Sequence, residues 1–359
     1  MTWVNLGGRF KVRSADGINF QGIPTPPTST LAACVSLSRL ILFCIVRRIQ
    51  VVYVDDWLFF RNHPLRSLAG TIGIRVVGMK LALDERDPSV DFRIATGELS
   101  PKSEGYARLV KTIRLSERFS NLIILTSKAY EQQYVSDGFS RQKVIGSFRG
   151  IDTSIFNPGA DGNEIRSRLN LGGKFVIGWF GLMHSFRLIR EVLAPMIHEA
   201  ASTMPDAHFL IGGEGPLFTE FQNLSNSKDL PLTVLGFVPY SELPKYLMAC
   251  DVLLCPVSTD FRHTRNSAWL KIPEALAVGR PVIATRTNVS DLDYKDMKAV
   301  LWVKPSLTGF KGGLQELREN YPRYLSQAQE QARHFDEYEV SNTIGKIVDR
   351  IELLAGRPS

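Results

Sequence analysis

Residues 266 to 285 read NSAWLKIPEALAVGRPVIAT. This order predicts a loop, then a short helix and then, after the turn at 279 to 281, an apolar strand. The free amides of residues 267 to 270 are expected to point outward at the positive end of the helix dipole, where a diphosphate would bind. Lys271 adds a cation, and Glu274 adds a carboxylate that can accept hydrogen bonds from hydroxyl groups. A phosphate site, a cation and a hydroxyl acceptor together predict a nucleotide-sugar pocket.

Short apolar strands alternate with helical segments on both sides of this stretch. Towards the C-terminus we expect strands at 175–180, 207–211, 232–235, 252–255, 281–284 and 299–303, followed by helical residues 322–354. Towards the N-terminus we expect strands at 50–54, 76–83 and 122–126, and helices at 104–120 and 127–137, with Ser127 as a helix cap. This alternation predicts an α/β fold with doubly wound sheets.

Four further motifs occur in order along the chain. They are residues 149–158 (RGIDTSIFNP), 212–217 (GGEGPL), 236–239 (GFVP) and 249–256 (ACDVLLCP). Together with residues 266–285, they resemble GT-B glycosyltransferases, especially family 4 and the related capsule and lipopolysaccharide sugar transferases. The resemblance implies a GT-B architecture, in which two Rossmann-like, doubly wound parallel-sheet domains face a cleft. It also implies sugar transfer from a nucleoside diphosphate sugar, as co-substrate, to a glycan or lipid-linked acceptor.

The resemblance sets the expected domain boundaries. Residues 1–155 would form the acceptor-side domain, 156–172 a linker with Pro158, Gly159 and Gly162, and 173–335 the donor domain. Residues 336–359 would form a helix that crosses back to the first domain. Met1 to Pro27 offers Gly7-Gly8 but no evident apolar strand before it, so the first strand-helix unit of the family is expected to be missing or altered.

The resemblance also implies roles in donor binding. Gly181 matches a glycine turn, Arg187 falls where the family has a phosphate-binding Lys, and Leu182 falls at the Arg position, so Arg190 or Arg262 would have to replace that cation. Glu274 takes the second place of the family's Glu-x7-Glu motif and would bind the ribose hydroxyls. Asn266 stands at the first glutamate's place, beside the donor sugar. The remaining expected donor-site residues are Gly213, Glu214, Phe237, Val238, Ser267, Ala268, Trp269, Leu270 and Lys271.

Some of these positions allow a second interpretation. Phe237 lies on a turn that in the family is beside the nucleobase, but it could instead fill the core below the turn. Trp269 could stack on a base or sugar, or cover the helix. Arg187 could lie on a solvated helix face.

Asp87 is the candidate catalytic residue. It follows an apolar strand, precedes Pro88 and resembles the Arg-Asp-Pro strand end of related transferases. Strand ends of an open parallel sheet face the ligand cleft, so a carboxylate here could take a proton from an acceptor hydroxyl if the reaction inverts configuration. If the reaction retains configuration, which the family-4 likeness favours, Asp87 would orient a substrate. Asp84, Asp55 and Asp56 are the alternatives.

Charge is uneven along the chain, whose net charge is +7. Residues 1–160 carry +8, from 21 basic and 13 acidic residues, whereas residues 161–359 carry −1. This asymmetry predicts contact between the first domain and an anionic membrane or lipid phosphate, or else an ordinary solvated surface. Nucleic acid is not expected, because basic and aromatic residues do not interleave. No metal site is expected, because no convincing Asp-x-Asp motif occurs.

The most apolar run, residues 31–46, is too short to span a bilayer and contains Arg39. We expect a helix packed within the first domain, or a helix that dips into a membrane beside Arg47 and Arg48. The four cysteines, Cys34, Cys44, Cys250 and Cys255, show no disulfide or metal-ligand spacing, which favours a cytoplasmic protein, peripheral to the membrane if it binds one.

Two alternative functions remain open at this point. A nucleotide-sugar epimerase would use the same donor pocket without an acceptor. A non-catalytic partner subunit would be consistent with the unusual N-terminus and with Asn266. A nicotinamide-dependent enzyme is disfavoured, because no Gly-x-Gly-x-x-Gly turn lies between a strand and a helix.

Overall fold

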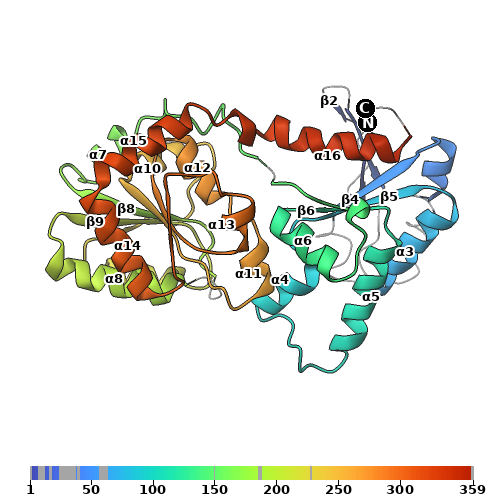
Figure 1. The fold of residues 1–359 in the computed structure, drawn as a ribbon, viewed down its shortest axis with the longest axis horizontal. Helices are drawn as coiled ribbons and strands as arrows, with labels where there is room; N and C mark the ends of the chain where they lie inside the picture. The colour runs from blue at the N-terminus through green and yellow to red at the C-terminus, as the bar shows by residue number, and fades with distance from the viewer. Residues whose placement is uncertain are drawn as a thin grey trace.

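The computed structural model describes residues 2–6, 13–15, 18–23, 38, 41–55, 64–148, 150–184, 188–226 and 229–356. They form two lobes that lie side by side, and one long helix, α16 (Val340–Leu354), runs from one lobe across the other (Figure 1). We call the lobe built on residues before 150 the N-lobe and the other the C-lobe. The domain boundaries themselves remain a prediction.

The C-lobe is built on a six-stranded parallel sheet in the order β10-β9-β8-β11-β12-β13. The strands are β8 (Phe175–Phe180), β9 (Ala207–Gly212), β10 (Leu232–Val234), β11 (Val252–Cys255), β12 (Val282–Thr285) and β13 (Val300–Val303). All six strands lie where the sequence predicts them. In β8, Ile177 and Trp179 pack into one core and Val176 and Phe180 into the other. Both faces are therefore buried, which explains why the strands are almost continuously apolar.

Helices cover both faces of this sheet. One face carries α8 (Ile189–Thr203), α9 (Phe218–Ser225) and α14 (Leu307–Glu319). The other carries α10 (Leu243–Ala249), α12 (Lys271–Ala277) and α15 (Tyr321–Ala332). The shorter helices are α7 (Asn163–Arg168), α11 (Arg262–Asn266), α13 (Asn288–Leu292) and the 3-10 turn η2 (Asp336–Tyr338). Helix α7 lies inside the expected linker.

The N-lobe is built on a four-stranded parallel sheet in the order β4-β5-β6-β7. The strands are β4 (Val51–Asp55), β5 (Lys80–Glu85), β6 (Leu122–Leu125) and β7 (Val144–Gly146). The helices are α3 (Pro64–Val76), α4 (Ser89–Ala95), α5 (Tyr106–Phe119), α6 (Lys128–Ser136) and the 3-10 turn η1 (Arg141–Lys143). The predicted start of a strand at Val76 is wrong, because Val76 ends α3 and the strand begins at Lys80.

Helix α16 closes one face of the N-lobe sheet. Its Ile347 packs with Leu122 and Ile124 of β6 and with Ala82 of β5, and is only 4% exposed. Burial of one such side chain stabilises the contact by about 1.5–3 kcal/mol. The neighbouring residues of β6, Ile123 and Leu125, face the other way and pack against α6.

A separate three-stranded sheet has the order β1-β3-β2 and comprises β1 (Thr2–Leu6), β2 (Arg13–Ala15) and β3 (Ile18–Ile23). β1 pairs parallel to β3, and β2 pairs antiparallel to it. A strand therefore does precede Gly7-Gly8, but it lies in this separate sheet and not in the sheet of β4, so the expectation that the family's first strand-helix unit is missing or altered stays a prediction. The sequence of β1, TWVNL, has too little alternation to be recognised.

Candidate donor site and the contacts between the lobes

Three glycine-containing turns converge at the carboxyl ends of β8, β9 and β10. The Gly213 amide donates to the Gly236 carbonyl at 2.6 Å, and the Gly181 amide donates to the Gly212 carbonyl at 2.9 Å. Gly213 has φ +138°, and a Cβ there would lie 1.9 Å from the Gly181 carbonyl oxygen. Only glycine permits this approach. Ligands collect at this edge of open parallel sheets, so the turns are positioned for one.

Lys271, the first residue of α12, reaches these turns. Its Nζ donates to the Phe180 carbonyl at 2.9 Å and lies 4.6 Å from the centre of the Trp179 ring. The ring face attracts the ammonium group, and the carbonyl holds one of its protons. The structure thus brings Lys271 and Gly181 together, as the nucleotide-sugar interpretation requires.

Glu274 lies one turn further along α12 and is 8% exposed. Burial raises the pKa of its carboxyl to about 7, while the nearby Lys271 lowers it. Burial, together with the charge of Glu274, raises the pKa of the neighbouring Tyr240 to about 12. A carboxylate removed from water in this way accepts hydrogen bonds strongly from any hydroxyl group that reaches it. Tyr240, which directly follows the 236–239 turn, is a neighbour that sequence reasoning missed.

The loop between α11 and α12 differs in part from expectation. The Ser267 amide donates to the His263 carbonyl at 2.9 Å, so the prediction that this amide faces a ligand is wrong. Ser267 also places its Oγ 3.1 Å from His263 Nδ1. For Ala268 and Leu270, no backbone acceptor is found within the described part of the chain. The Trp269 ring packs edge-on to His263 of α11, with centroids 5.9 Å apart, and lies against the C-lobe core.

The 236–239 turn presents one side chain to solvent and buries the other. Phe237 is 69% exposed, whereas Val238 is partly buried and packs against the C-lobe core. A Cβ at Gly212 would lie 3.1 Å from Val238 Cγ2, so this side chain also lies against the β9 turn. Phe237 therefore does not fill the core below the turn. Glu214 is likewise exposed, and its carbonyl accepts from the Met183 amide at 2.8 Å.

Asn266 is 1% exposed and lies where the two lobes meet. Its carbonyl accepts a hydrogen bond from Ser127 of the N-lobe, and its Oδ1 accepts from Asn288 Nδ2 at 2.8 Å. Its own Nδ2 has no hydrogen-bond partner among the described residues. A buried amide donor without a partner destabilises the structure by about 1–3 kcal/mol, so a bound acceptor there would restore the loss.

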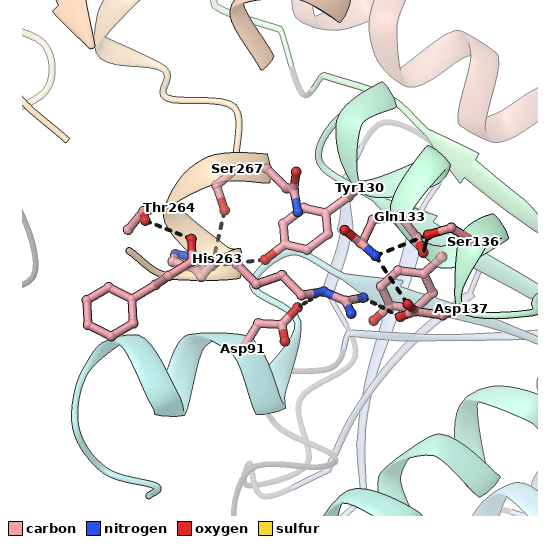
Figure 2. A network of polar contacts seen from close by, with 12 residues as sticks. Asp91, Tyr130, Gln133, Ser136, Asp137, His263, Thr264 and Ser267 are labelled. Carbon is pink, nitrogen blue, oxygen red and sulfur yellow. Dashed lines mark hydrogen bonds and ion pairs between the residues drawn. The ribbon is translucent and has the colours of Figure 1, made fainter. Parts of the chain in front are cut away.

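Asp87 of the N-lobe lies close to His263, which belongs to α11 of the C-lobe. It follows β5 and precedes Pro88, the N-cap of α4, and its Oδ1 lies 3.6 Å from His263 Nε2. His263 is 2% exposed, and its Nδ1 lies 3.4 Å from the hydroxyl of Tyr130. In Figure 2, His263 lies between Ser267 and Tyr130. Nothing in the sequence around His263 indicated this contact, because it depends on how the lobes meet.

The alternative carboxylates lie elsewhere. Asp84 is fully buried and accepts a hydrogen bond from the Tyr53 hydroxyl, and Glu85 is fully buried as well. The expectation that the acidic end of β5 faces a cleft is thus wrong for these two residues. Asp87 is more accessible, with a side chain that is 41% exposed, and its role stays a prediction. The side chain of Asp55 and the whole of Asp56 fall outside the described structure.

The cations that were expected to replace the missing phosphate ligand have other partners. Arg262 of α11 forms ion pairs with Asp91 of α4, at 2.9 Å, and with Asp137 at the end of α6, at 2.5 Å. Figure 2 shows these two carboxylates on either side of the guanidinium group. Burial raises the pKa of Asp91, and Arg262 opposes that shift. Arg190 pairs with Glu220 at 2.9 Å. Arg187 lies outside the described residues.

The described parts of the chain contain no group of three or more His, Cys, Asp or Glu side chains that could hold a metal ion. They also contain no helix with the length and hydropathy needed to cross a bilayer. Cys44, Cys250 and Cys255 are buried, and Cys34 falls outside the described residues.

Comparison with known proteins agrees with this architecture. Residues 174–320 match the family described as Glycosyl transferases group 1. The chain is 23% identical over 193 residues to sulfoquinovosyl transferase SQD2 of Arabidopsis thaliana, which is 52% of this chain and 35% of that protein. It is 31% identical over 124 residues to the GPI3 subunit of the Saccharomyces cerevisiae phosphatidylinositol N-acetylglucosaminyltransferase, which is 31% of this chain and 27% of that protein. The match thus spans about a third of these relatives.

Solved structures resemble the whole chain. HepE of Anabaena in complex with UDP superposes with a TM-score of 0.69 at 15% identity, over 93% of this chain and 86% of that one. Sucrose-phosphate synthase of Thermosynechococcus elongatus superposes with a TM-score of 0.65 at 15% identity, over 95% of this chain and 85% of that one. These similarities establish the GT-B fold, with two α/β lobes.

Proposed function

We propose that this chain, which has the GT-B fold and carries a Glycosyl transferases group 1 domain in its C-lobe, transfers a sugar from a nucleoside diphosphate sugar to a glycan or lipid-linked acceptor. One observation carries the proposal. Lys271 is held 2.9 Å from the carbonyl that precedes the Gly181 turn, one helical turn from the buried carboxylate of Glu274. A cation at a glycine turn suits a diphosphate, and a buried carboxylate suits the ribose hydroxyls.

Donor binding would use the turns and α12 together. The backbone at Gly181 and Gly213 would lie against the diphosphate, since neither residue has a side chain to block it. Lys271 would leave the Phe180 carbonyl and pair with the phosphate oxygens. As the sugar departs, negative charge grows on the leaving diphosphate, and a cation and amide dipoles already in position stabilise it without a metal ion. The exposed Phe237 would lie beside the nucleobase.

The sugar would lie between α11 and the N-lobe. There the unpartnered Nδ2 of Asn266 would donate a hydrogen bond to a sugar hydroxyl, which supports a role for this residue even though it replaces a glutamate. Asp87, exposed on the N-lobe side, would orient the acceptor or sugar in a retaining reaction of the family-4 type. In an inverting reaction it would act as the base. Retention is the outcome we favour.

The acceptor and the cellular location are part of the proposal. HepE was solved with UDP and with UDP-glucose, so uridine nucleotides are the first donors to try. The name of the GPI3 subunit's enzyme refers to phosphatidylinositol, which favours a lipid-linked acceptor. We infer a cytoplasmic protein of polysaccharide or glycolipid biosynthesis that is peripheral to the inner face of the membrane.

A thermal-shift panel tests donor binding. Uridine, guanosine and adenosine diphosphates and their sugars are added at saturating concentration, and one nucleotide series should raise the melting temperature of the wild type. Lys271→Met and Glu274→Gln should lose most of that rise, whereas Lys346→Met, at an exposed position of α16, should keep it. If no nucleotide shifts the wild type, the donor site does not exist as proposed.

Product analysis with the matching donor then separates the alternatives. An isomerised nucleotide sugar formed without any acceptor would identify an epimerase. Donor binding without turnover, with every lipid and glycan acceptor offered, would favour a non-catalytic subunit. Sugar transfer supports the proposal.

A further inference from the structure

An exposed apolar surface lies on the N-lobe, away from the donor site. Half of the fourteen large apolar side chains that are exposed in the described structure belong to residues 41–46, to α3 and to the residue after it. They are between 40% and 78% exposed. We call this group the α3 surface; it consists of Leu42, Ile45, Val46, Leu65, Ile72, Val76 and Val77.

The spacing of these residues places them on one side of each helix. In α3, Ile72 and Val76 follow Leu65 by seven and eleven residues, a spacing that keeps all three within one narrow stripe of the helix. Ser67, Thr71 and Ile74, on other sides of α3, are buried. Helical residues 41–46 lie against α3, because Ile41 Cδ1 is 3.0 Å from the position of a Cβ on Gly73. Both segments lie at the outer edge of the N-lobe, far from the C-lobe (Figure 1).

Exposed cations border this surface. Residues 41–54 and 64–83 contain no Asp or Glu but contain Arg47, Arg48, Arg66, Arg75 and Lys80. Arg47 and Arg48 are exposed directly after the apolar residues 42–46. Exposed cations beside an exposed apolar surface fit a partner that is both anionic and apolar.

A second group of cations lies at the C-terminal end of α3. Burial, together with the positive charges of Arg75 and Arg118, lowers the pKa of Lys143 to about 8. The Lys143 ammonium donates to the Arg118 carbonyl at 2.5 Å, so the two residues are in contact. The positive charges of Arg75 and Arg118 act on the Lys143 ammonium, and a bound phosphate group would offset them.

We propose that the α3 surface docks on an anionic lipid membrane, with its apolar side chains at the boundary of the acyl chains and its cations among the lipid phosphates. A second copy of the chain fits less well, because a two-fold interface would bring both copies of Arg47 and Arg48 into one interface, where like charges repel. The inference deepens the acceptor part of the proposed function by naming where a lipid-linked acceptor is met. It does not depend on donor binding.

Vesicle sedimentation tests the proposal with the whole chain. Wild-type protein should sediment with vesicles that contain phosphatidylglycerol and should remain in solution with pure phosphatidylcholine vesicles. Binding should weaken at least tenfold between about 0.05 and 0.5 M salt, because the cations are screened. Arg47→Gln with Arg48→Gln should reduce the partition coefficient at least tenfold, and Leu65→Glu with Val76→Glu about a hundredfold.

Matched variants control for charge and folding. Ala201→Glu with Ser326→Glu adds the same two charges at exposed positions of α8 and α15 in the C-lobe, and should bind vesicles as the wild type does. The nucleotide thermal shift should be retained in every variant, which separates failure of this inference from failure of the donor site. If anionic vesicles do not bind the wild type, or the C-lobe variant loses binding equally, the proposal is wrong. A dimer that the Leu65→Glu, Val76→Glu variant abolishes would also overturn it.

Discussion

Glu274→Gln should make the protein more stable and at the same time remove donor binding. The carboxyl group is 8% exposed, and burial raises its pKa from 4.5 to about 7. The folded state therefore holds this proton more tightly than the unfolded state. Stability is then lost as the pH rises from below 4.5 to above 7, where the folded protein must contain the carboxylate. Gln has the same shape and no charge to bury.

The size of the effect follows from the pKa. The two pKa values differ by 2.5, and each pKa unit corresponds to about 1.36 kcal/mol. The substitution should therefore raise the free energy of unfolding by at most about 3 kcal/mol at pH 8. For a cooperative unit of 150–250 residues this corresponds to at most roughly 6–12 °C in melting temperature. At pH 5 the carboxyl of the folded wild type is mostly protonated, so the variant and the wild type should differ much less.

The assay is a series of melting curves between pH 5 and pH 8, with and without the nucleotide that shifts the wild type. Glu104→Gln, at an exposed position, serves as the control and should follow the wild type at every pH. The reasoning fails if Glu274→Gln melts no higher than the wild type at pH 8, or if the difference between them does not grow with pH. A variant that gains stability but still responds fully to nucleotide would show that Glu274 is buried without binding the donor.

Three other changes test separate parts of the structure. Gly213→Ala should lower the free energy of unfolding by more than about 2 kcal/mol in urea titrations, because its Cβ meets a backbone carbonyl, whereas Gly172→Ala, with nothing within 4 Å, should be nearly neutral. Ser127→Ala should lose about 1–2 kcal/mol in the same titrations, since it removes the N-cap of α6 and the bond to the donor loop. Arg262→Met leaves the buried Asp91 unpaired, so we expect a loss of about 3 kcal/mol by chemical denaturation, most of it recovered in Arg262→Met with Asp91→Asn. Equal stability of the single and double variants would contradict this last point.

The sequence predicted the C-lobe well because its local signals agree with one another. Each strand there is an apolar run bounded by turn residues, and both of its faces are buried. Gly181, Gly213 and Lys271 could be placed in one site because strand ends in such a sheet meet at one edge. Ser127 was recognisable as a cap because it directly precedes a helical segment.

The parts that could not be predicted depend on contacts between distant segments. His263 and Arg262 belong to the short helix α11, and their partners Asp87, Asp91 and Asp137 lie in the N-lobe. No local sequence pattern shows which residues of one lobe contact which residues of the other. The start of β5 was placed too early because residues 76–77 are apolar and directly precede the strand. In the structure they are exposed at the end of α3 and do not enter the sheet.

Helix α11 is only five residues long, yet Arg262, His263 and Asn266 all touch the N-lobe from it. The loop of residues 267–270 begins at its last turn. If the two lobes rotate against each other, α11 must either keep its N-lobe partners or stay fixed to the C-lobe. In the first case the loop of residues 267–270 changes shape, and in the second it keeps its shape. Under the proposed function, movement of the N-lobe would then shift the loop that lies next to the donor sugar, because α11 joins the two directly.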